Sequence, residues 1–381
     1  MRKLVKLALG AGTALGLAGL AAPGAGAAQP GWGYGIPGGH NVVFVQTDNV
    51  AGNQIVAYDR AANGTLTQAG TYATEGLGGQ LNGSVADHLG SQGSLAYDPA
   101  QGLLYAVNAG SNTVSVFSVQ GDALSLRQVV GSGGVFPVSV AVHGNLVYVL
   151  NAQGGGSVQG FVSFWGKLLP LPATNRNLGL TIPTDTTQYT HTPGEVAFSP
   201  DGSQLIVTTK ASGNSIDVFH VGPWGWLSPP VVNSEPGAVP FAVTFDSTGH
   251  LVVANAGTDS LTTYTLSPGG TVTPIDTLGT GAVATCWLTT AQGFLYAVNA
   301  GSNSVSGFTS SPSGSLSLLG ATGTDPGPVD ASSSAGGQYL YVQAGVNGNV
   351  DEFQVGSGGA LTPIGSVLVP GAAGGEGIVA F

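Results

Sequence analysis

Short apolar segments alternate with turns rich in Gly, Ser and Asn along nearly the whole chain. Each repeating unit starts with an apolar segment, and after a turn a second segment follows, usually ending near an Asn. Six units open at residues 94–97, 139–142, 195–198, 242–245, 285–288 and 330–333, and their second segments end at Asn108, Asn151, Thr209, Asn255, Asn299 and Ala344. The last four of these ends are 46, 44 and 45 residues apart, which is the length of a four-stranded propeller blade.

A thirteen-residue phrase occurs twice almost unchanged, at residues 105–117 and 296–308. A seventh unit, with segments at 42–46, 54–58 and 65–69, lacks its opening segment, and the last residues, 378–381, match the missing pattern. The sequence therefore predicts an all-β, seven-bladed propeller of four-stranded blades over residues 42–381. The C-terminal strand is expected to pair into the N-terminal blade, which closes the ring and leaves no open sheet edge between blades.

Two units carry insertions, residues 71–93 and 173–193, each between an outer strand and the next inner strand. Both insertions are therefore expected on one face, over the mouth of the central channel. Long loops on one face of a rigid scaffold are frequent sites of function.

The N-terminal residues 1–28 are typical of a bacterial Sec-type signal peptide, with residues 29–41 as a lead-in to the propeller. Arg2, Lys3 and Lys6 precede an apolar stretch, and small residues at 25–27 form a cleavage site. The alternative, a membrane anchor, is disfavoured because the apolar stretch is short and rich in Gly and Ala. We expect a secreted, extracellular, monomeric protein with no membrane span.

Charge and cysteine content exclude several classes of function. Without the signal peptide, five basic residues remain against 19 acidic ones, so no nucleic-acid binding is expected and a strong attraction to anionic substrates such as sugar phosphates is disfavoured. The single Cys286 permits neither a disulfide nor a cysteine-ligated zinc site, and is expected to be a small buried residue. No resident cofactor or metal is expected, although a cation bound in the channel stays open. Expected partners are a small neutral molecule or an extracellular polymer.

The Phe-Ser-Pro-Asp-Gly motif at 198–202, and the prolines that precede inner strands at 137, 193, 240 and 328, resemble the lactonase family of seven-bladed propellers. That family includes 6-phosphogluconolactonases and fungal carboxymuconate cycloisomerases. The resemblance implies lactone chemistry at the channel mouth. The Arg and His residues that the family places after these prolines are missing, and His191 is one position out of register. A phosphorylated or polycarboxylate substrate is therefore not expected.

Inner-strand starts point toward the channel mouth, where Ser94, Ser139, Glu195 and Asp330 are expected to meet Glu376. Neighbouring carboxylates raise one another's pKa, which gives one acid and one base near neutral pH. Glu195 and Asp330 are therefore candidate catalytic residues for hydrolysing an uncharged lactone or related ester, and Glu376, Ser94 and Ser139 are candidate substrate contacts. The alternative is that these groups hold water or a cation.

The two insertions carry further candidates. His191 and Arg176 would act as proton shuttle and oxyanion donor, and His88 and Tyr189 would contact substrate. The alternative is that all four only solvate their loops. No Ser nucleophile elbow, phosphate loop or HExxH motif is present.

Tryptophans mark two hairpins between third and fourth strands: Trp165 in one, Trp224 and Trp226 in the next. They predict an exposed aromatic patch on the face opposite the insertions, although each ring could instead fold over its own sheet edge. Exposed aromatic residues are frequent contacts for polymers and proteins. Two functions stay open: a lactonase-type hydrolase, or a non-catalytic extracellular binding propeller for a cell-surface polymer or protein.

Overall fold

The computed structural model describes residues 41–381. The expected signal peptide, and all of the expected lead-in except Asn41, lie outside these residues. Within 41–381, no helix has the length and hydropathy needed to cross a membrane.

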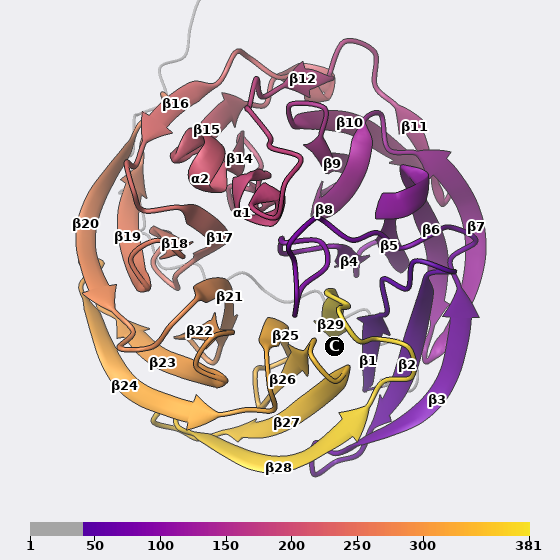
Figure 1. The fold of residues 1–381 in the computed structure, drawn as a ribbon, viewed down its shortest axis with the longest axis vertical. Coiled ribbons are helices and arrows are strands. Elements are labelled where there is room, and N and C mark those ends of the chain that lie inside the picture. Colours follow the sequence, from indigo (N-terminus) through magenta and orange to yellow (C-terminus); the bar gives the residue numbers. More distant parts are fainter. Residues whose placement is uncertain (1–40) are drawn as a thin grey trace, which may run out of the picture. The chain divides into compact units, whose positions relative to one another are not determined.

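Seven antiparallel sheets surround a central channel, as predicted (Figure 1). Blade one contains, from channel to rim, β29 (Ile378–Ala380), β1 (Val42–Gln46), β2 (Gln54–Arg60) and β3 (Leu66–Ala73). Blade two contains β4 (Leu95–Asp98), β5 (Leu103–Asn108), β6 (Thr113–Gln120) and β7 (Ala123–Gly131). Blade three contains β8 (Val135–His143), β9 (Leu146–Gln153), β10 (Ser157–Phe164) and β11 (Lys167–Pro170), with β12 (Arg176–Asn177) paired to β10.

The other four blades have the same order. Blade four contains β13 (Val196–Phe198), β14 (Gln204–Thr208), β15 (Ser215–His220) and β16 (Val231–Ser234). Blade five contains β17 (Pro240–Phe245), β18 (Leu251–Asn255), β19 (Ser260–Leu266) and β20 (Val272–Gly279). Blade six contains β21 (Thr285–Ala291), β22 (Phe294–Asn299), β23 (Ser304–Ser310) and β24 (Leu316–Gly323). Blade seven contains β25 (Pro328–Ser333), β26 (Tyr339–Ala344), β27 (Asn349–Val355) and β28 (Leu361–Leu368).

The predicted ring closure is confirmed. β29 pairs antiparallel with β1, with Phe44 opposite Val379, and the backbone of Val42 exchanges two hydrogen bonds of 3.0 Å with Phe381. The last residues of the chain thus complete the first blade as its inner strand.

Second strands form the cores between blades. All residues of β1, β5, β14 and β26 are buried, because each blade is covered on both faces by its neighbours. Outer strands such as β3 are mostly exposed or half-buried, with only Leu66 of β3 buried, as expected at the rim of the ring. The apolar runs seen in the sequence therefore supply the packing that holds the ring together.

The repeated phrase serves the fold. Asn108 ends β5, and its side-chain amide donates to Ser115 at 2.8 Å; Asn299 ends β22 and donates to Ser306 at 2.9 Å. The second Asn of each phrase has a positive φ, 56° at Asn112 and 49° at Asn303, which is a conformation that Asn tolerates. Both asparagines therefore shape the turn between second and third strands.

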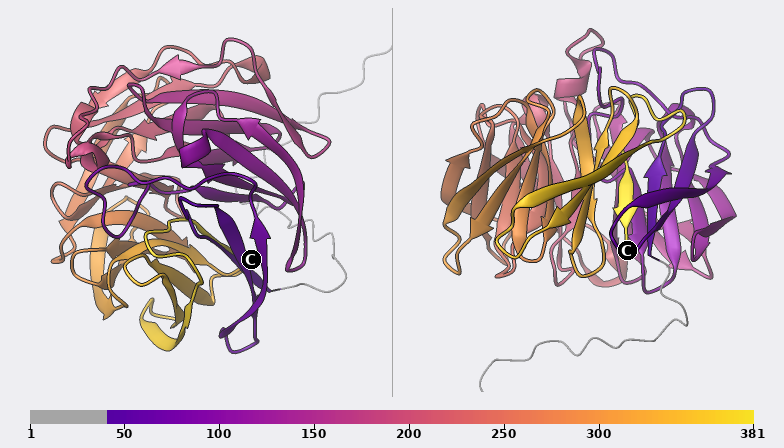
Figure 2. Two further views of the ribbon diagram at one scale, coloured as in Figure 1. Left: turned by 45° about the vertical axis from the view of Figure 1, so that its right-hand side comes forward. Right: turned by 90° about the horizontal axis from the view of Figure 1, so that it is seen from below.

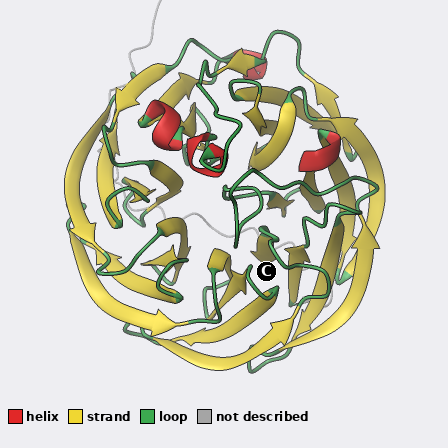
Figure 3. Ribbon diagram, in the orientation of Figure 1, coloured by secondary structure: helices red, strands yellow, loops and turns green. Residues whose placement is uncertain are grey.

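The insertions contain more regular structure than the sequence suggests. β3 continues to Ala73, so the first inserted loop starts at residue 74 rather than 71. The second contains β12 and the one-turn helix α1 (Gln188–His191), followed by α2 (Lys210–Gly213) after β14. The short 3₁₀ helices are η1 (Ala109–Ser111) and η2 (Pro223–Gly225). Loops and α1 project from one face of the ring (Figure 2), and α1 lies near its centre (Figure 3).

Candidate functional site

Residues 87–94, here called the channel segment, close the mouth of the central channel. The Ser91 hydroxyl donates to the Val138 carbonyl of blade three at 2.9 Å. The backbone N–H of Gln92 donates to the carbonyl of Gly194, which precedes blade four, at 3.1 Å. The first insertion is therefore a plug that bonds to the inner strands, and not an open loop above them.

Gln92 extends this plug across the ring to blade six. Its side-chain amide donates to the Leu288 carbonyl at 2.9 Å and accepts from the Leu288 N–H at 2.8 Å. Trp287 donates its indole N–H to the Ser91 carbonyl at 2.6 Å. The side chain of Gln92 thus pairs with a strand as a neighbouring backbone would.

The three predicted carboxylates lie under this plug. Glu195 accepts from the Val243 N–H at 2.7 Å, and Asp330 accepts from the Ile378 N–H at 3.1 Å. Glu376 accepts from the N–H of Gly93 in the channel segment at 2.9 Å. Each carboxylate therefore links an inner strand, or the plug, to the neighbouring blade.

Burial sets the ionisation of these groups. Loss of solvation raises the pKa of Glu195, Asp330 and Glu376, and the charge of Asp330 raises the pKa of both glutamates further. Each glutamate lies close enough to Asp330 for that charge to act on it. The sequence placed the three residues in a partly dry site at the channel mouth; in the structure they are almost fully buried, with exposed fractions of 8%, 5% and 0%. A substrate above the plug would therefore not contact them.

The two predicted serines are also structural. Ser94 donates its hydroxyl to the Glu376 carbonyl at 2.6 Å, and the Ser139 hydroxyl accepts from the Val196 N–H at 3.2 Å. Both residues are fully buried, so neither is exposed to contact a substrate as expected.

Among the loop candidates, Arg176 and His191 do not reach the carboxylates. Arg176 lies in β12 at the outer edge of the ring (Figure 1), where its guanidinium donates to the carbonyls of Ala173, Asn175 and Leu227. The Nδ1 atom of His191 lies 2.9 Å from the Thr187 carbonyl of its own helical turn. These two side chains stabilise their own loops.

His88 and Tyr189 have different surroundings. His88 belongs to the channel segment and its ring packs against Gly374; burial lowers its pKa, and its Nδ1 is buried without a hydrogen-bond partner among residues 41–381. Tyr189, in α1, lines a pocket. Of the predicted site residues, Tyr189 is therefore the one that the structure places on a cavity wall.

That cavity, here called the mouth pocket, has a volume of about 260 Å³ and lies beside the plug. Its walls come from the first insertion, from α1 and from the inner strands of blades five and six. Phe241 and Trp287 meet edge to face, with ring centroids 5.1 Å apart. Cys286 and Asp87 also line it. The pocket is mostly apolar, with one carboxylate in its wall.

Lys210 and Asp87 form the polar base of this region. The Lys210 ammonium is buried, donates to the carbonyls of Gly90 and Tyr189, and lies 5.0 Å from the centroid of the Phe241 ring. Burial lowers the pKa of Lys210 and raises that of Asp87, while the charge of each partner opposes the other's shift. Asp87 also accepts the N–H groups of three channel-segment residues, Leu89, Gly90 and Ser91, at 2.8–2.9 Å.

The sequence reasoning missed Asp87, Lys210, Phe241 and Trp287. One signal was available: Lys210 is one of five basic residues after the signal peptide, and it follows the end of a buried strand. Cys286 was expected to be buried; it is only partly buried, although desolvation raises the pKa of its thiol to about 12. Its place on a pocket wall carried no signal in the sequence.

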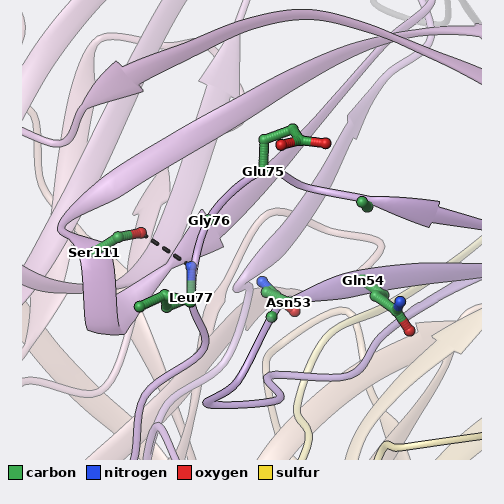
Figure 4. A pocket seen from close by; sticks show the side chains of 8 residues that line it. Asn53, Gln54, Glu75, Gly76, Leu77 and Ser111 are labelled. Atoms are coloured by element: carbon green, nitrogen blue, oxygen red, sulfur yellow. Dashed lines mark hydrogen bonds between the residues drawn. The ribbon is translucent and has the colours of Figure 1, made fainter.

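A second pocket of about 330 Å³ lies between blades one and two (Figure 4). Several of its polar groups are already engaged: Asn53 donates to the Val107 carbonyl at 2.9 Å, and the Leu77 N–H donates to Ser111 at 3.1 Å. Among the described residues, no group of three or more His, Cys, Asp or Glu side chains is arranged to hold a metal. The mouth pocket is therefore the better candidate site.

Comparisons with known proteins place the fold. Neither protein-family models nor curated protein sequences give a match. A solved structure of a candidate 6-phosphogluconolactonase from Bacteroides uniformis has a TM-score of 0.74 at 20% identity, covering 90% of this chain and 99% of that one. The periplasmic gluconolactonase of Pseudomonas aeruginosa has a TM-score of 0.70 at 17% identity, covering 89% and 98%. These similarities confirm a lactonase-like propeller fold.

Proposed function

We propose that the protein binds a small, uncharged cyclic molecule of the lactone class in the mouth pocket. The observation that carries the proposal is the wall of this pocket, in which the Phe241 and Trp287 rings lie beside the single carboxylate of Asp87. Small-molecule sites typically combine apolar and aromatic walls with few polar groups. A volume of about 260 Å³ suits a ligand of one small ring.

The charges around the pocket support a neutral ligand. Asp87 would repel a phosphate or carboxylate, and the Lys210 ammonium already donates to two backbone carbonyls. The solved structures of similar fold include proteins named for phosphorylated and unphosphorylated gluconolactones. For this chain, the unphosphorylated class agrees with the pocket.

Hydrolysis of the bound ring is a second candidate function, because Asp87 is a desolvated carboxylate in the pocket wall. Burial raises its pKa, which makes it a better base toward water near neutral pH. Its oxygens also accept three backbone N–H groups, so the same carboxylate holds the channel segment. We place binding before hydrolysis because the Asp87 carboxylate is already engaged in holding the channel segment.

The test is calorimetric titration of the purified protein with δ-valerolactone, glucono-δ-lactone and 6-phosphogluconolactone, with proton release followed in parallel. We expect the neutral lactones to bind and the phosphorylated one to bind at least tenfold more weakly. Ala300→Leu, which fills the pocket, should abolish binding, whereas Ala62→Leu on an exposed turn should not.

Equal binding by wild type and Ala300→Leu, or no binding by the folded protein, would overturn the proposal. Proton release that is lost in Asp87→Asn while lactone binding persists would establish hydrolysis. Thermal unfolding of each variant checks that it is folded.

A further inference from the structure

The face opposite the channel plug carries exposed aromatic rings on two neighbouring hairpins. Trp165 is 83% exposed, Trp224 is 91% exposed and Trp226 is 47% exposed, and Phe164 beside Trp165 is also exposed. The alternative in which each ring folds over its own sheet edge does not describe Trp165 or Trp224. We call Phe164, Trp165, Trp224 and Trp226 the tryptophan face.

The blade-four hairpin is held against blade three, the blade that carries the other hairpin. In blade four, the Gly225 carbonyl accepts from the Tyr148 hydroxyl of blade three, and the Leu227 carbonyl accepts from Arg176. A Cβ on Gly225 would come within 3.0 Å of Leu171, which follows the other hairpin along the chain. The tryptophan face is therefore one rigid surface on blades three and four.

Both turns hold a tryptophan in a left-handed backbone conformation that bulky residues rarely adopt. Trp165 and Gly166 join Phe164 to Lys167 as a two-residue turn with φ values of 52° and 73°. Trp224 and Gly225 repeat this pair with φ values of 64° and 77°. Such turns favour Asn-Gly, because a bulky residue at positive φ is strained. Strain of this kind is characteristic of functional positions.

Positive charge accompanies these rings in a chain that is otherwise acidic. Residues 41–381 contain five Lys and Arg side chains, and two of them, Arg127 and Lys167, are exposed. Lys167 adjoins the Trp165–Gly166 turn, and a Cβ on Gly166 would lie 3.6 Å from the Arg127 Nε atom. Asp201, on another hairpin of blade four, is engaged by the hydroxyls of Ser199 and Ser203.

From these observations we propose that the tryptophan face, with Arg127 and Lys167, docks an anionic polysaccharide. Flat indole rings stack on the apolar faces of sugar rings, and the two cations pair with the carboxylates of uronate units. The rigid hairpins hold the indole rings on a fixed backbone, which lowers the ordering cost on binding. This site is separate from the mouth pocket and does not depend on the function proposed there.

The probe is polygalacturonate, titrated into the full-length purified chain, with neutral dextran as the matched polymer. We expect saturable binding to polygalacturonate that weakens with salt, and at least tenfold weaker binding to dextran. The double variant Trp165→Asn/Trp224→Asn converts both turns to Asn-Gly. It should lose binding at least tenfold without lowering the melting temperature, so a loss of binding cannot be attributed to misfolding.

Arg127→Gln/Lys167→Gln should reduce the affinity severalfold and flatten its salt dependence. Val85→Asn, an exposed change on the plug face, is the control and should leave binding unchanged. Equal affinity for dextran, unchanged binding by the double tryptophan variant, or no binding to polygalacturonate would each overturn the proposal. Binding to phosphatidylglycerol vesicles without binding to polygalacturonate would overturn it in favour of a membrane surface.

Discussion

Asp48 should make the propeller lose stability as pH rises from acidic to mildly alkaline values. Its side chain is fully buried, accepts the Glu376 N–H at 2.8 Å and accepts from the Gln46 amide. Burial, reinforced by the charges of Asp87 and Asp330, raises its pKa from 3.8 to about 8. The native state therefore holds a proton on Asp48 over a pH range in which the unfolded chain has released it.

The sign follows from this difference. Below about pH 4 Asp48 is protonated in both states, and its pKa shift costs nothing. Between about pH 4 and pH 8 the unfolded state gains by ionising, at about 1.4 kcal/mol per pH unit, so the free energy of unfolding falls by at most about 6 kcal/mol. Above about pH 8 the loss is complete. For a domain of this size that corresponds to roughly 8 °C in melting temperature.

Asp48→Asn removes the titrating group with little change in shape. Asp48 has a φ of 49°, which Asn accepts, and the new amide can donate to the Gln46 Oε1, which is buried without a partner among residues 41–381. We expect little difference from wild type at pH 4 and a variant that is increasingly more stable by pH 8.

The assay is chemical denaturation of wild type and Asp48→Asn at half-unit pH steps from 4 to 8.5. Asp59→Asn, at an exposed position in β2, is the matched control and should follow the wild-type curve. A wild-type stability that rises over this range, or an Asp48→Asn curve parallel to wild type, would show that the burial argument is wrong.

Three other tests address the plug and the pocket. Lys210→Met leaves two buried carbonyls without a donor and Asp87 without its cation, so denaturant titration should show a loss of about 3 kcal/mol, partly recovered in Lys210→Met/Asp87→Asn. Gln92→Ala removes both bonds to Leu288, and should cost about 2 kcal/mol and speed hydrogen exchange in the channel segment. Burial raises the pKa of Cys286 to about 12, so iodoacetamide at pH 8 should label the thiol in denaturant and not in the native protein, as mass spectrometry would show.

Periodic features of the sequence predicted the fold well. Turn residues that recur at a constant interval determine the number of blades, the ring closure and most strands. A pattern recognised in one repeat therefore helps to identify the same strand in the others. Strand ends were less accurate: β9 continues two residues past the expected Asn151 to Gln153, and β3 runs to Ala73 rather than to residue 69. Both strands are longer than expected because they pair with neighbouring strands. The residue pattern of a single strand carries no information about that pairing.

The candidate site was harder to predict, because insertions have no repeat to compare with. The sequence placed both insertions over the channel mouth, but gave no sign that Gln92 would pair with Leu288, 196 positions away. Without that contact, the inner-strand carboxylates were expected to line the channel mouth. In the structure, these carboxylates accept hydrogen bonds from backbone N–H groups. The accessible cavity is the mouth pocket at Phe241 and Trp287.

The plug and the acidic inner strands are best understood together. A chain segment that enters a propeller channel brings backbone N–H groups into a dry region, where each needs an acceptor. Glu376 supplies one for Gly93, and Asp87 supplies acceptors for its own segment. The Arg and His side chains that the lactonase resemblance leads one to expect at these strand starts could not accept such bonds while charged. Carboxyl groups at these strand starts are therefore compatible with a filled channel. The two proposed ligand surfaces lie away from the centre of the channel.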